Sequence, residues 1–248
     1  MRHASDVILT TEALGKSFDG LRANNDINFT LKKNRVHALI GPNGAGKTTF
    51  VSMLIGRLEP TDGAIWFDGK NVTEMPAHRR VAQGMGYTFQ ITSVFARLSC
   101  HENVALAARR RLGRNRAAVD EAVARALGRV GLGERAEEVA GDLSYGHQRL
   151  LEIAMGLASM PRLLILDEPT QGLAESEIAA FKALIRELSS ETTILLIEHN
   201  MSVVMELADE ITVLNFGEIL AHGTAAEIHA NPAVQAAYLG TETADAED

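Results

Sequence analysis

The feature that most constrains the fold of this chain is the run GPNGAGKT at residues 41–48, which fits the pattern G-x-x-x-x-G-K-[ST]. It follows VHALI (36–40), which predicts a strand, and it leads into KTTFVSMLIGRL (47–58), which predicts a helix. Glycines let the backbone turn so that successive N–H groups point inward, and the start of a helix adds positive potential. The run therefore predicts a phosphate-binding loop, or P-loop, in preference to a purely structural glycine turn.

The P-loop offers defined ligands to a nucleotide. Lys47 can reach the β- and γ-phosphates, and the Thr48 hydroxyl can ligate Mg²⁺. A P-loop alone does not separate ATPases from GTPases and kinases. The nucleotide-binding residues expected here are Gly41, Pro42, Asn43, Gly44, Ala45, Gly46, Lys47, Thr48 and Thr49.

A pair of carboxylates at the end of LLILDEP (163–169) narrows the chemistry. Ligands gather at the carboxyl ends of strands in open α/β sheets, and Asp167 can hold Mg²⁺ there through its waters. Glu168 can polarise a water for in-line attack on the γ-phosphate, whereas a kinase would direct this position at a substrate hydroxyl. A solvated strand end is the alternative interpretation of the pair. The chain has no N-K-x-D guanine-reading motif, so adenine is preferred.

The apolar pattern predicts an α/β fold. RLLILDEP (162–169) and TTILLIEH (192–199) are nearly continuous apolar runs, as in strands buried on both faces of a parallel sheet. Between them, residues 175–188 carry a helical apolar stripe, so strand, helix and strand imply a right-handed crossover. The other expected elements are strands over 7–15, 27–31 and 36–40, a hairpin over 63–72 that turns at Asp68-Gly69, and helices between His101 and Leu132 that break near glycines 113 and 131.

Composition and charge limit the partners and the location. Of the 248 residues, 46% are hydrophobic and 23% charged, the balance of a packed globular protein. The 24 Lys and Arg residues against 32 Asp and Glu give a net charge of -8, which disfavours nucleic acid as a partner. No apolar run approaches the roughly 20 residues of a membrane span and no signal-peptide core is present, so a cytosolic chain is expected. Cys100 is the only cysteine and is expected to be a partly buried thiol without a metal.

A second turn that opens a helix, LSYGHQRLLEIA (143–154), leads to a family resemblance. By the same dipole argument it could bind a phosphate, although Ser144 could also be a simple N-cap. The P-loop, LSYGHQ, LLILDEP and a histidine that ends the next strand, in that order, resemble the nucleotide-binding subunit of an ABC transporter over residues 7–239. The resemblance implies an ABC ATPase cassette: a RecA-like P-loop NTPase core, an N-terminal antiparallel β subdomain and a helical subdomain at about 91–160. A frayed acidic tail, 240–248, would follow.

The resemblance also implies a head-to-tail dimer that encloses two ATP molecules. Each would lie between the P-loop of one copy and the LSYGHQ turn of the other. Ser144, Gly146 and Gln148 would then contact the nucleotide in trans. One chain would carry two phosphate turns because each site would combine the P-loop of one copy with the LSYGHQ turn of the other.

Further positions acquire roles through the same resemblance. Phe18 matches the aromatic that stacks on adenine, and core packing is the alternative interpretation. Gln90 matches the glutamine that joins Mg²⁺ and the attacking water to the helical subdomain, and a surface loop residue is the alternative interpretation. His199 matches the switch histidine that contacts the γ-phosphate, with a structural histidine as the alternative. The implied catalytic set is Glu168, His199 and Gln90, and the implied Mg²⁺ set is Thr48, Gln90 and Asp167.

Two positions depart from the common family pattern. Ala174 stands where the family usually has an acidic or amide residue, which implies altered communication between the two sites without loss of ATP binding. The signature reads LSYGHQ instead of the commonest LSGGQ, although its serine and second glycine are present.

The tyrosine in the signature and the closing AAYLG resemble the importer branch that serves branched-chain amino acids and urea. Such importers combine two integral-membrane permeases, a periplasmic binding protein and usually two different ATPase chains. The resemblance therefore implies a second ATPase subunit, as a heterodimer or homodimer, and a peripheral location on the cytoplasmic face of the inner membrane. Because substrate contacts lie in the other polypeptides, the sequence does not identify the cargo.

The arginine-rich run RRRLGRNR (109–116) and two rival functions stay open at this stage. The run could be a solvated helix end, or it could face anionic lipid headgroups or an acidic coupling segment. Some ABC ATPases act on DNA or ribosomes, but the coiled-coil insertion or duplicated cassette typical of them is missing. A module that binds ATP without hydrolysing it is the other rival, and Glu168 and His199 argue against it.

Overall fold

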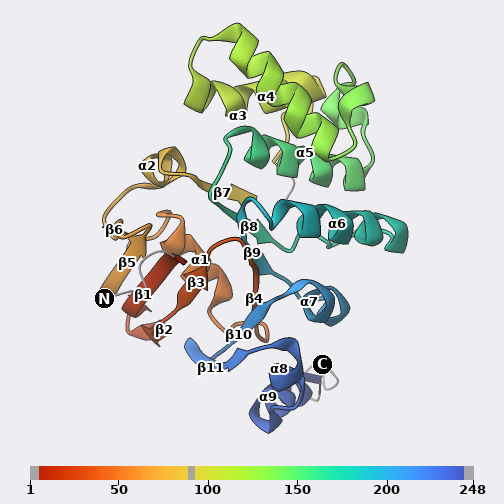
Figure 1. Cartoon of the computed structure of the whole chain (residues 1–248). Coiled ribbons are helices and arrows are strands. Elements are labelled where there is room, and N and C mark those ends of the chain that lie inside the picture. The colour runs from red at the N-terminus through yellow and green to blue at the C-terminus, as the bar shows by residue number, and fades with distance from the viewer. Residues whose placement is uncertain (1–5, 89–92, 243–248) are drawn as a thin grey trace.

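The computed structural model describes residues 6–88 and 93–242. Figure 1 shows a central sheet with a second sheet packed on one side and a layer of helices, α3 to α5, at the opposite end from α8 and α9. Gln90, expected to join the Mg²⁺ site to the helical subdomain, lies outside the described residues.

The central sheet has six strands in the order β11-β10-β4-β9-β8-β7. The five strands from β10 to β7 are parallel, and β11 adds an antiparallel edge. Every residue of β4, β8 and β9 is buried, as their continuous apolar runs predict. The strands are β4 (Val36–Ile40), β7 (Met85–Thr88), β8 (Leu163–Asp167), β9 (Thr193–Ile197), β10 (Glu210–Asn215) and β11 (Glu218–Gly223).

The predicted strand, helix and strand over 162–199 is present. Helix α6 (Glu175–Leu188) has the predicted bounds, and it connects the parallel neighbours β8 and β9. Phe181, Leu184, Ile185 and Leu188 form its buried face. The α/β fold class is therefore confirmed.

The second sheet is antiparallel, with the order β2-β1-β5-β6 and β3 paired to β1. The predicted strand over 27–31 is wrong, because one strand ends at Ile27 and the next begins at Thr30. Asp26 has a φ of +47°, and the Asn28 side chain accepts a hydrogen bond from the N–H of Ala13 at 2.9 Å. The strands are β1 (Val7–Phe18), β2 (Leu21–Ile27), β3 (Thr30–Lys32), β5 (Asp62–Phe67) and β6 (Lys70–Asn71).

Helix α1 (Lys47–Leu54) follows the P-loop and ends earlier than the predicted residue 58. Gly56 has a φ of +74°, which terminates the helix. Arg80, which lies within α2 (Ala77–Ala82), is almost completely buried and donates to the carbonyls of Met53 and Leu54 at 2.7 Å each. A cation thus satisfies the last carbonyls of α1, where the helix dipole favours positive charge.

The helical layer consists of α3 (Cys100–Leu112), α4 (Arg116–Arg129) and α5 (Tyr145–Ala158). The breaks fall at the predicted glycines: Gly113 has a φ of +63° and Gly131 a φ of +74°. Short 3-10 turns at Gly133–Arg135 and Ala140–Asp142 lead into α5. Cys100 is buried, and burial raises the pKa of its thiol.

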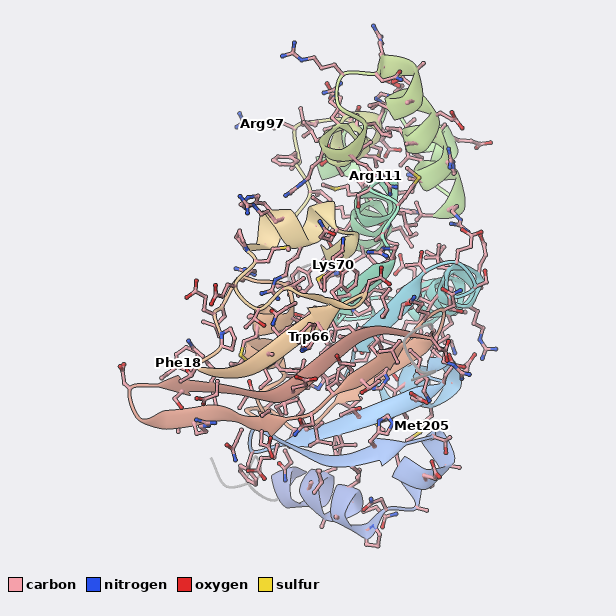
Figure 2. The ribbon with its side chains drawn as sticks, turned by 60° about the vertical axis from the view of Figure 1, so that its left-hand side comes forward. Phe18, Trp66, Lys70, Arg97, Arg111 and Met205 are labelled. Carbon is pink, nitrogen blue, oxygen red and sulfur yellow. The ribbon has the colours of Figure 1, made fainter. Side chains whose placement is uncertain are left out.

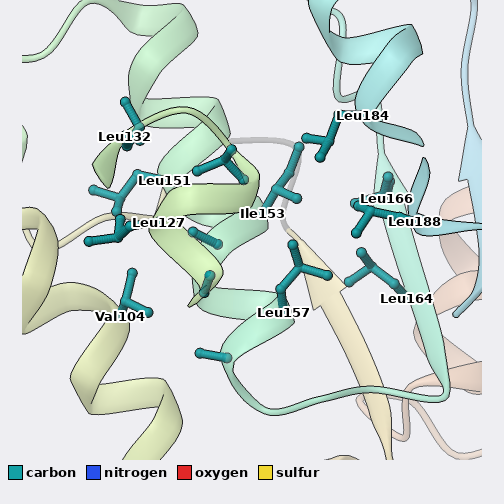
Figure 3. Close-up of a cluster of buried hydrophobic side chains, with 14 of the residues drawn as sticks. Val104, Leu127, Leu132, Leu151, Ile153, Leu157, Leu164, Leu166, Leu184 and Leu188 are labelled. Carbon is teal, nitrogen blue, oxygen red and sulfur yellow. The ribbon is translucent and has the colours of Figure 1, made fainter. Parts of the chain in front are cut away.

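Helix α5 joins this layer to the central sheet. Figure 3 shows leucines of the helical layer on one side of Ile153 and Leu157, and leucines of β8 and α6 on the other. All belong to one continuous apolar cluster, so the helices share the core of the sheet. The side chains labelled there are Val104, Leu127, Leu132, Leu151, Ile153, Leu157, Leu164, Leu166, Leu184 and Leu188.

Part of the arginine-rich run has a structural contact. Arg110 donates to the carbonyl of His78 at 2.6 Å, and Arg111 donates to the carbonyls of Ser159 and Met160 at 3.0 and 2.9 Å. Figure 2 shows Arg111 beside the end of α5. These two arginines connect the end of α3 to α2 and to the end of α5, while Arg114 and its neighbours are exposed.

The chain closes with α7 (Met201–Leu207), α8 (Ala225–His229) and α9 (Pro232–Glu242). The last helix extends past residue 240, where fraying was expected to begin. Within the described residues, no helix combines the length and apolar character needed to cross a membrane.

Candidate nucleotide site

The P-loop lies between the end of β4 and the start of α1. Gly46 is the N-cap of α1 with a φ of +95°, and no side chain caps the helix. A Cβ at Gly46 would lie 2.6 Å from Asn24 Nδ2 and 2.7 Å from the carbonyl oxygen of Ala23. The first N–H groups of α1 therefore have no side-chain acceptor, as a loop that receives an anion requires.

Lys47 holds its ammonium group against the loop. Its Nζ donates to the carbonyls of Gly41 at 2.6 Å and Pro42 at 3.0 Å. Burial lowers the pKa of Lys47, and the negative charges of Glu168 and Asp167 act in the opposite direction. The cation is thus placed near both predicted carboxylates.

Asp167 ends β8 and is buried. Burial raises the pKa of its carboxyl group, the hydroxyl of Tyr87 lowers it by donating to Oδ2 at 2.8 Å, and the Glu168 charge raises it. Tyr87 was missed by the sequence analysis. It occupies the next strand, β7, where it pairs with Ile165 of β8, so only the pairing of these strands brings it to Asp167.

Glu168 and His199 meet at the ends of two neighbouring strands. The Nε2 atom of His199 lies 2.7 Å from Oε1 of Glu168. Glu168 has a φ of +47°, and its N–H donates to the carbonyl of Ile197 at 2.9 Å. A left-handed conformation is costly for glutamate, and such strain is concentrated at functional sites. The two residues predicted to act on the γ-phosphate are therefore in direct contact.

Glu198 is a second residue that the sequence analysis missed. It is buried and accepts hydrogen bonds from the N–H and hydroxyl of Thr170 and from the N–H groups of His199 and Asn200, at 2.5 to 3.2 Å. It therefore joins the segment after Glu168 to the segment that carries His199. A glutamate that directly follows the apolar run TTILLI was the available signal, because buried carboxylates are rare unless they are bonded.

Lys47, Glu168 and His199 border a cavity of about 520 Å³, which we call the P-loop cavity, whereas Asp167 is not among the residues that line it. Phe18 is not among the residues that line it. Its ring is partly exposed, with the ammonium of Lys16 at 5.3 Å, and Figure 2 shows it near one end of the antiparallel sheet. The cavity is lined by Leu21, Arg22, Ala23, Asn43, Gly44, Ala45, Gly46, Lys47, Thr48, Thr49, Glu168, His199 and Phe216.

The LSYGHQ turn lies outside the P-loop cavity, and its polar groups form hydrogen bonds within the chain. Ser144 is the N-cap of α5, and its hydroxyl accepts from the N–H of His147 at 3.3 Å. Gln148 Nε2 donates to the carbonyl of Leu143 at 3.1 Å. Gly146 is buried, and a Cβ there would clash with Glu177 Oε1. None of these residues lines the P-loop cavity of the same chain.

Comparison with known proteins defines the class. Residues 24–171 match the family model described as ABC transporter, so the chain belongs to the ABC transporter family and is an ATP-binding cassette ATPase. Residues 218–244 match a second model, described as branched-chain amino acid ATP-binding cassette transporter.

Individual relatives cover almost the whole chain. The high-affinity branched-chain amino acid transport ATP-binding protein BraF of Pseudomonas aeruginosa is 42% identical over 94% of this chain and 98% of its own length. The corresponding LivG protein of Escherichia coli is 40% identical over 95% of this chain and 99% of its own. The crystal structure of the ADP conformation of MJ1267, an ATP-binding cassette of an ABC transporter, aligns with a TM-score of 0.86 at 26% identity, covering 94% of this chain and 99% of that one.

Proposed function

We propose that this ATPase powers an importer of branched-chain or other hydrophobic amino acids. Support comes from the names of its relatives and from the branched-chain model at its carboxyl end. The same relatives favour transport over an ATPase that acts on DNA or ribosomes. Urea, amides and aromatic acids remain the related solutes to be tested as cargo.

The contact between Glu168 and His199 at 2.7 Å is the observation that carries the hydrolytic part of the proposal. The P-loop N–H groups and Lys47 bind the phosphates. Glu168 accepts a proton from the water that attacks the γ-phosphorus in line, while the bond to that phosphorus forms and the bond to the β-phosphate oxygen breaks. His199 holds the Glu168 carboxylate in position and contacts the γ-phosphate.

The residues near Lys47 fit a Mg²⁺ ion. Asp167 and Glu168 place two adjacent carboxylates at the end of β8, and burial disfavours ionisation of Asp167 in the absence of a cation. Thr48 is exposed at the start of α1. Thr48, Asp167 and Gln90 would hold the ion, which would neutralise charge on the β- and γ-phosphates.

We propose that Ser144, Gly146 and Gln148 act on the ATP of a second cassette. They lie at the start of helix α5, and none of them lines the P-loop cavity of their own chain. A head-to-tail pair of cassettes would bring each such turn to the partner's γ-phosphate. The partner is either another copy or a related ATPase chain.

We propose that the permeases bind at a second cavity, of about 570 Å³, which lies between the core and the helical layer. Its lining is mostly apolar and includes Phe95 and Leu106, which are both more than 40% exposed. Arg57 and Arg110 add positive charge, and the carboxylate of Glu152, which also lines the cavity, pairs with the buried Arg149. These features suit an amphipathic, acidic segment of a membrane protein, which would hold the chain at the cytoplasmic face of the inner membrane.

The substitution Glu168→Gln tests hydrolysis. It should lower kcat for ATP hydrolysis by roughly 1,000-fold, since positioned general bases contribute about 100- to 10,000-fold. ATP should still bind, and with ATP the variant should elute as a dimer in size-exclusion chromatography. Glu191→Gln is the matched control, because it removes an exposed carboxylate that pairs with Arg129. Unchanged turnover in Glu168→Gln would remove Glu168 from the role of base.

Uptake assays test the cargo. Cells whose only copy of the gene encodes Glu168→Gln should lose accumulation of labelled leucine, isoleucine and valine, and the wild-type gene should restore it. Labelled urea and phenylalanine measured in the same cells separate the related solutes. Loss of urea uptake with intact leucine uptake would overturn the branched-chain assignment.

A further inference from the structure

Three hairpins of the structure turn through two residues that both have positive φ, the pattern of a type I′ turn. Two of them use Asp-Gly, at 19–20 and 68–69, as this turn prefers. The third, between β10 and β11, uses Phe216-Gly217, with φ values of +45° and +80°. A bulky aromatic at this position carries a conformational cost that aspartate and asparagine largely avoid.

Phe216 is also exposed to water. Its exposed fraction is 88%, and that of Leu21 is 72%, which makes them the two most exposed large apolar side chains in the described part of the chain. Both line the P-loop cavity. Two unfavourable exposures therefore coincide at one cavity, where an apolar ligand surface would cover them.

The turn that carries Phe216 is fixed to the P-loop. The N–H of Gly217 donates to the carbonyl of Ala45 at 3.0 Å, and its carbonyl accepts from the N–H of Asn25 at 2.8 Å. Asn25 Nδ2 also donates to Glu218 Oε1 at 2.7 Å. Three bonds thus hold this turn against the loop and β2, so the Cα of Phe216 has a defined position relative to the phosphate site.

We propose that Phe216 and Leu21 form an apolar wall that contacts the nucleoside of the bound nucleotide, with Phe216 packing against its base or ribose. The phosphates would occupy the part of the cavity that the P-loop, Glu168 and His199 line, and Leu21, Arg22, Ala23 and Phe216 are the other lining residues. This inference rests on the proposed ATP site. It adds a nucleoside contact that does not depend on Phe18, which lies outside the cavity lining.

The substitution Phe216→Asn separates a ligand role from a structural one. Asparagine suits the turn and removes an exposed ring, so the melting temperature of the nucleotide-free protein should rise. The dissociation constant for ATP should increase about tenfold, the effect expected on removal of one aromatic contact to a base. A purely structural role for Phe216 would lower the melting temperature instead. Asp19→Asn, in the Asp-Gly turn between β1 and β2, is the matched control: it keeps a residue that suits the turn on an exposed position, and it should alter neither quantity appreciably.

Inorganic tripolyphosphate distinguishes this inference from the phosphate site itself. In a Glu168→Gln background that prevents turnover, Phe216→Asn should weaken ATP binding and leave tripolyphosphate binding unchanged. Lys47→Ala should weaken both ligands. Equal ATP affinity in Phe216→Asn and its parent would overturn the nucleoside contact while the phosphate site stands. Retention of both ligands by Lys47→Ala would overturn the proposed site.

A fluorescence experiment gives an independent readout. Trp66 is the only tryptophan, so Phe216→Trp in a Trp66→Phe background reports on position 216 alone. ATP should change its emission in dilute, monomeric protein, and tripolyphosphate should not. Emission that responds only when the protein dimerises would overturn the nucleoside contact and assign Phe216 to the interface between copies.

Discussion

The two turns that open helices α1 and α5 look alike in sequence and differ in structure. Both combine glycine with a hydroxyl residue and precede an apolar helix. At α1 the N-cap is Gly46, and no side chain satisfies the first N–H groups. At α5 the hydroxyl of Ser144 accepts from the N–H of His147, so the helix start is capped within the chain.

The two turns also differ in the cavity and the charged side chains around them. The P-loop borders a cavity and has Lys47 and two carboxylates beside it, whereas the turn at Ser144 borders none of that cavity. The comparison teaches that a complete phosphate site needs an uncapped helix start together with a neighbouring cation. The second turn has a capped helix start and does not border this cavity, so it is not a complete phosphate site within its own chain, which suits a role as the complement to another chain's site.

The largest expected effect concerns nucleotide affinity. Lys47→Ala removes a charged donor and should weaken ATP binding to the separate chain by roughly 100-fold, since hydrogen bonds to charged groups contribute about 1.5–3 kcal/mol. Ser144→Ala should leave that affinity within about twofold and still abolish turnover by the assembled dimer. Equilibrium binding and steady-state hydrolysis measure the two effects. A large loss of binding in the Ser144→Ala monomer would show that both turns serve one site.

The next largest effect is on the free energy of unfolding and concerns one glycine in each turn, Gly46 and Gly146. Gly46→Ala should destabilise the fold by about 3 kcal/mol, because it combines a positive φ with close approach to the backbone of Ala23. At Gly146 the Cβ would meet the carboxylate of Glu177, which can move aside, so Gly146→Ala should cost about 1 kcal/mol. Urea unfolding measures both. Equal losses would mean that Glu177 is as immobile as the backbone.

A third helix start sharpens the comparison. The N-cap of helix α6 is Ala174, whose N–H donates to the Glu177 carboxylate but whose side chain has no acceptor. Ala174→Ser should therefore stabilise the protein by about 1 kcal/mol, and Ser144→Ala should destabilise it by a similar amount. Thermal melts of the two variants check the prediction. A destabilised Ala174→Ser variant would show that this helix start cannot accept a side-chain cap.

The smallest effect concerns pH. The pKa of Asp167 is raised in the folded state, so the folded protein binds this proton more tightly than the unfolded chain, and stability falls as pH rises through the window above the ordinary aspartate pKa. Asp167→Asn should remove this loss and slightly raise the melting temperature at pH 7 without nucleotide. It should also impair hydrolysis with Mg²⁺. A lower melting temperature at pH 7 would mean that the Tyr87 contact with the charged carboxylate outweighs its burial.

Much of the fold could be predicted because the signals are local. The apolar runs at 163–167 and 193–197 predict buried parallel strands, and α6 appears with its predicted bounds. Strand β2 (Leu21–Ile27) was not predicted from the sequence, because LRANNDI is polar and forms a strand only through its pairing with β1. The motifs likewise singled out Lys47, Glu168 and His199, which the structure brings together at the P-loop cavity.

The sequence by itself determined the P-loop glycines, the carboxylates that end β8 and the family to which the chain belongs, because each depends on neighbouring residues and their conformational preferences. Only the tertiary structure decided that Tyr87 bonds Asp167, that Glu198 joins Thr170 to His199, and that Phe216 lines the cavity beside the P-loop. Each of these contacts brings together segments that are distant in the chain. Strand order and packing set them, and no local pattern of residues encodes them.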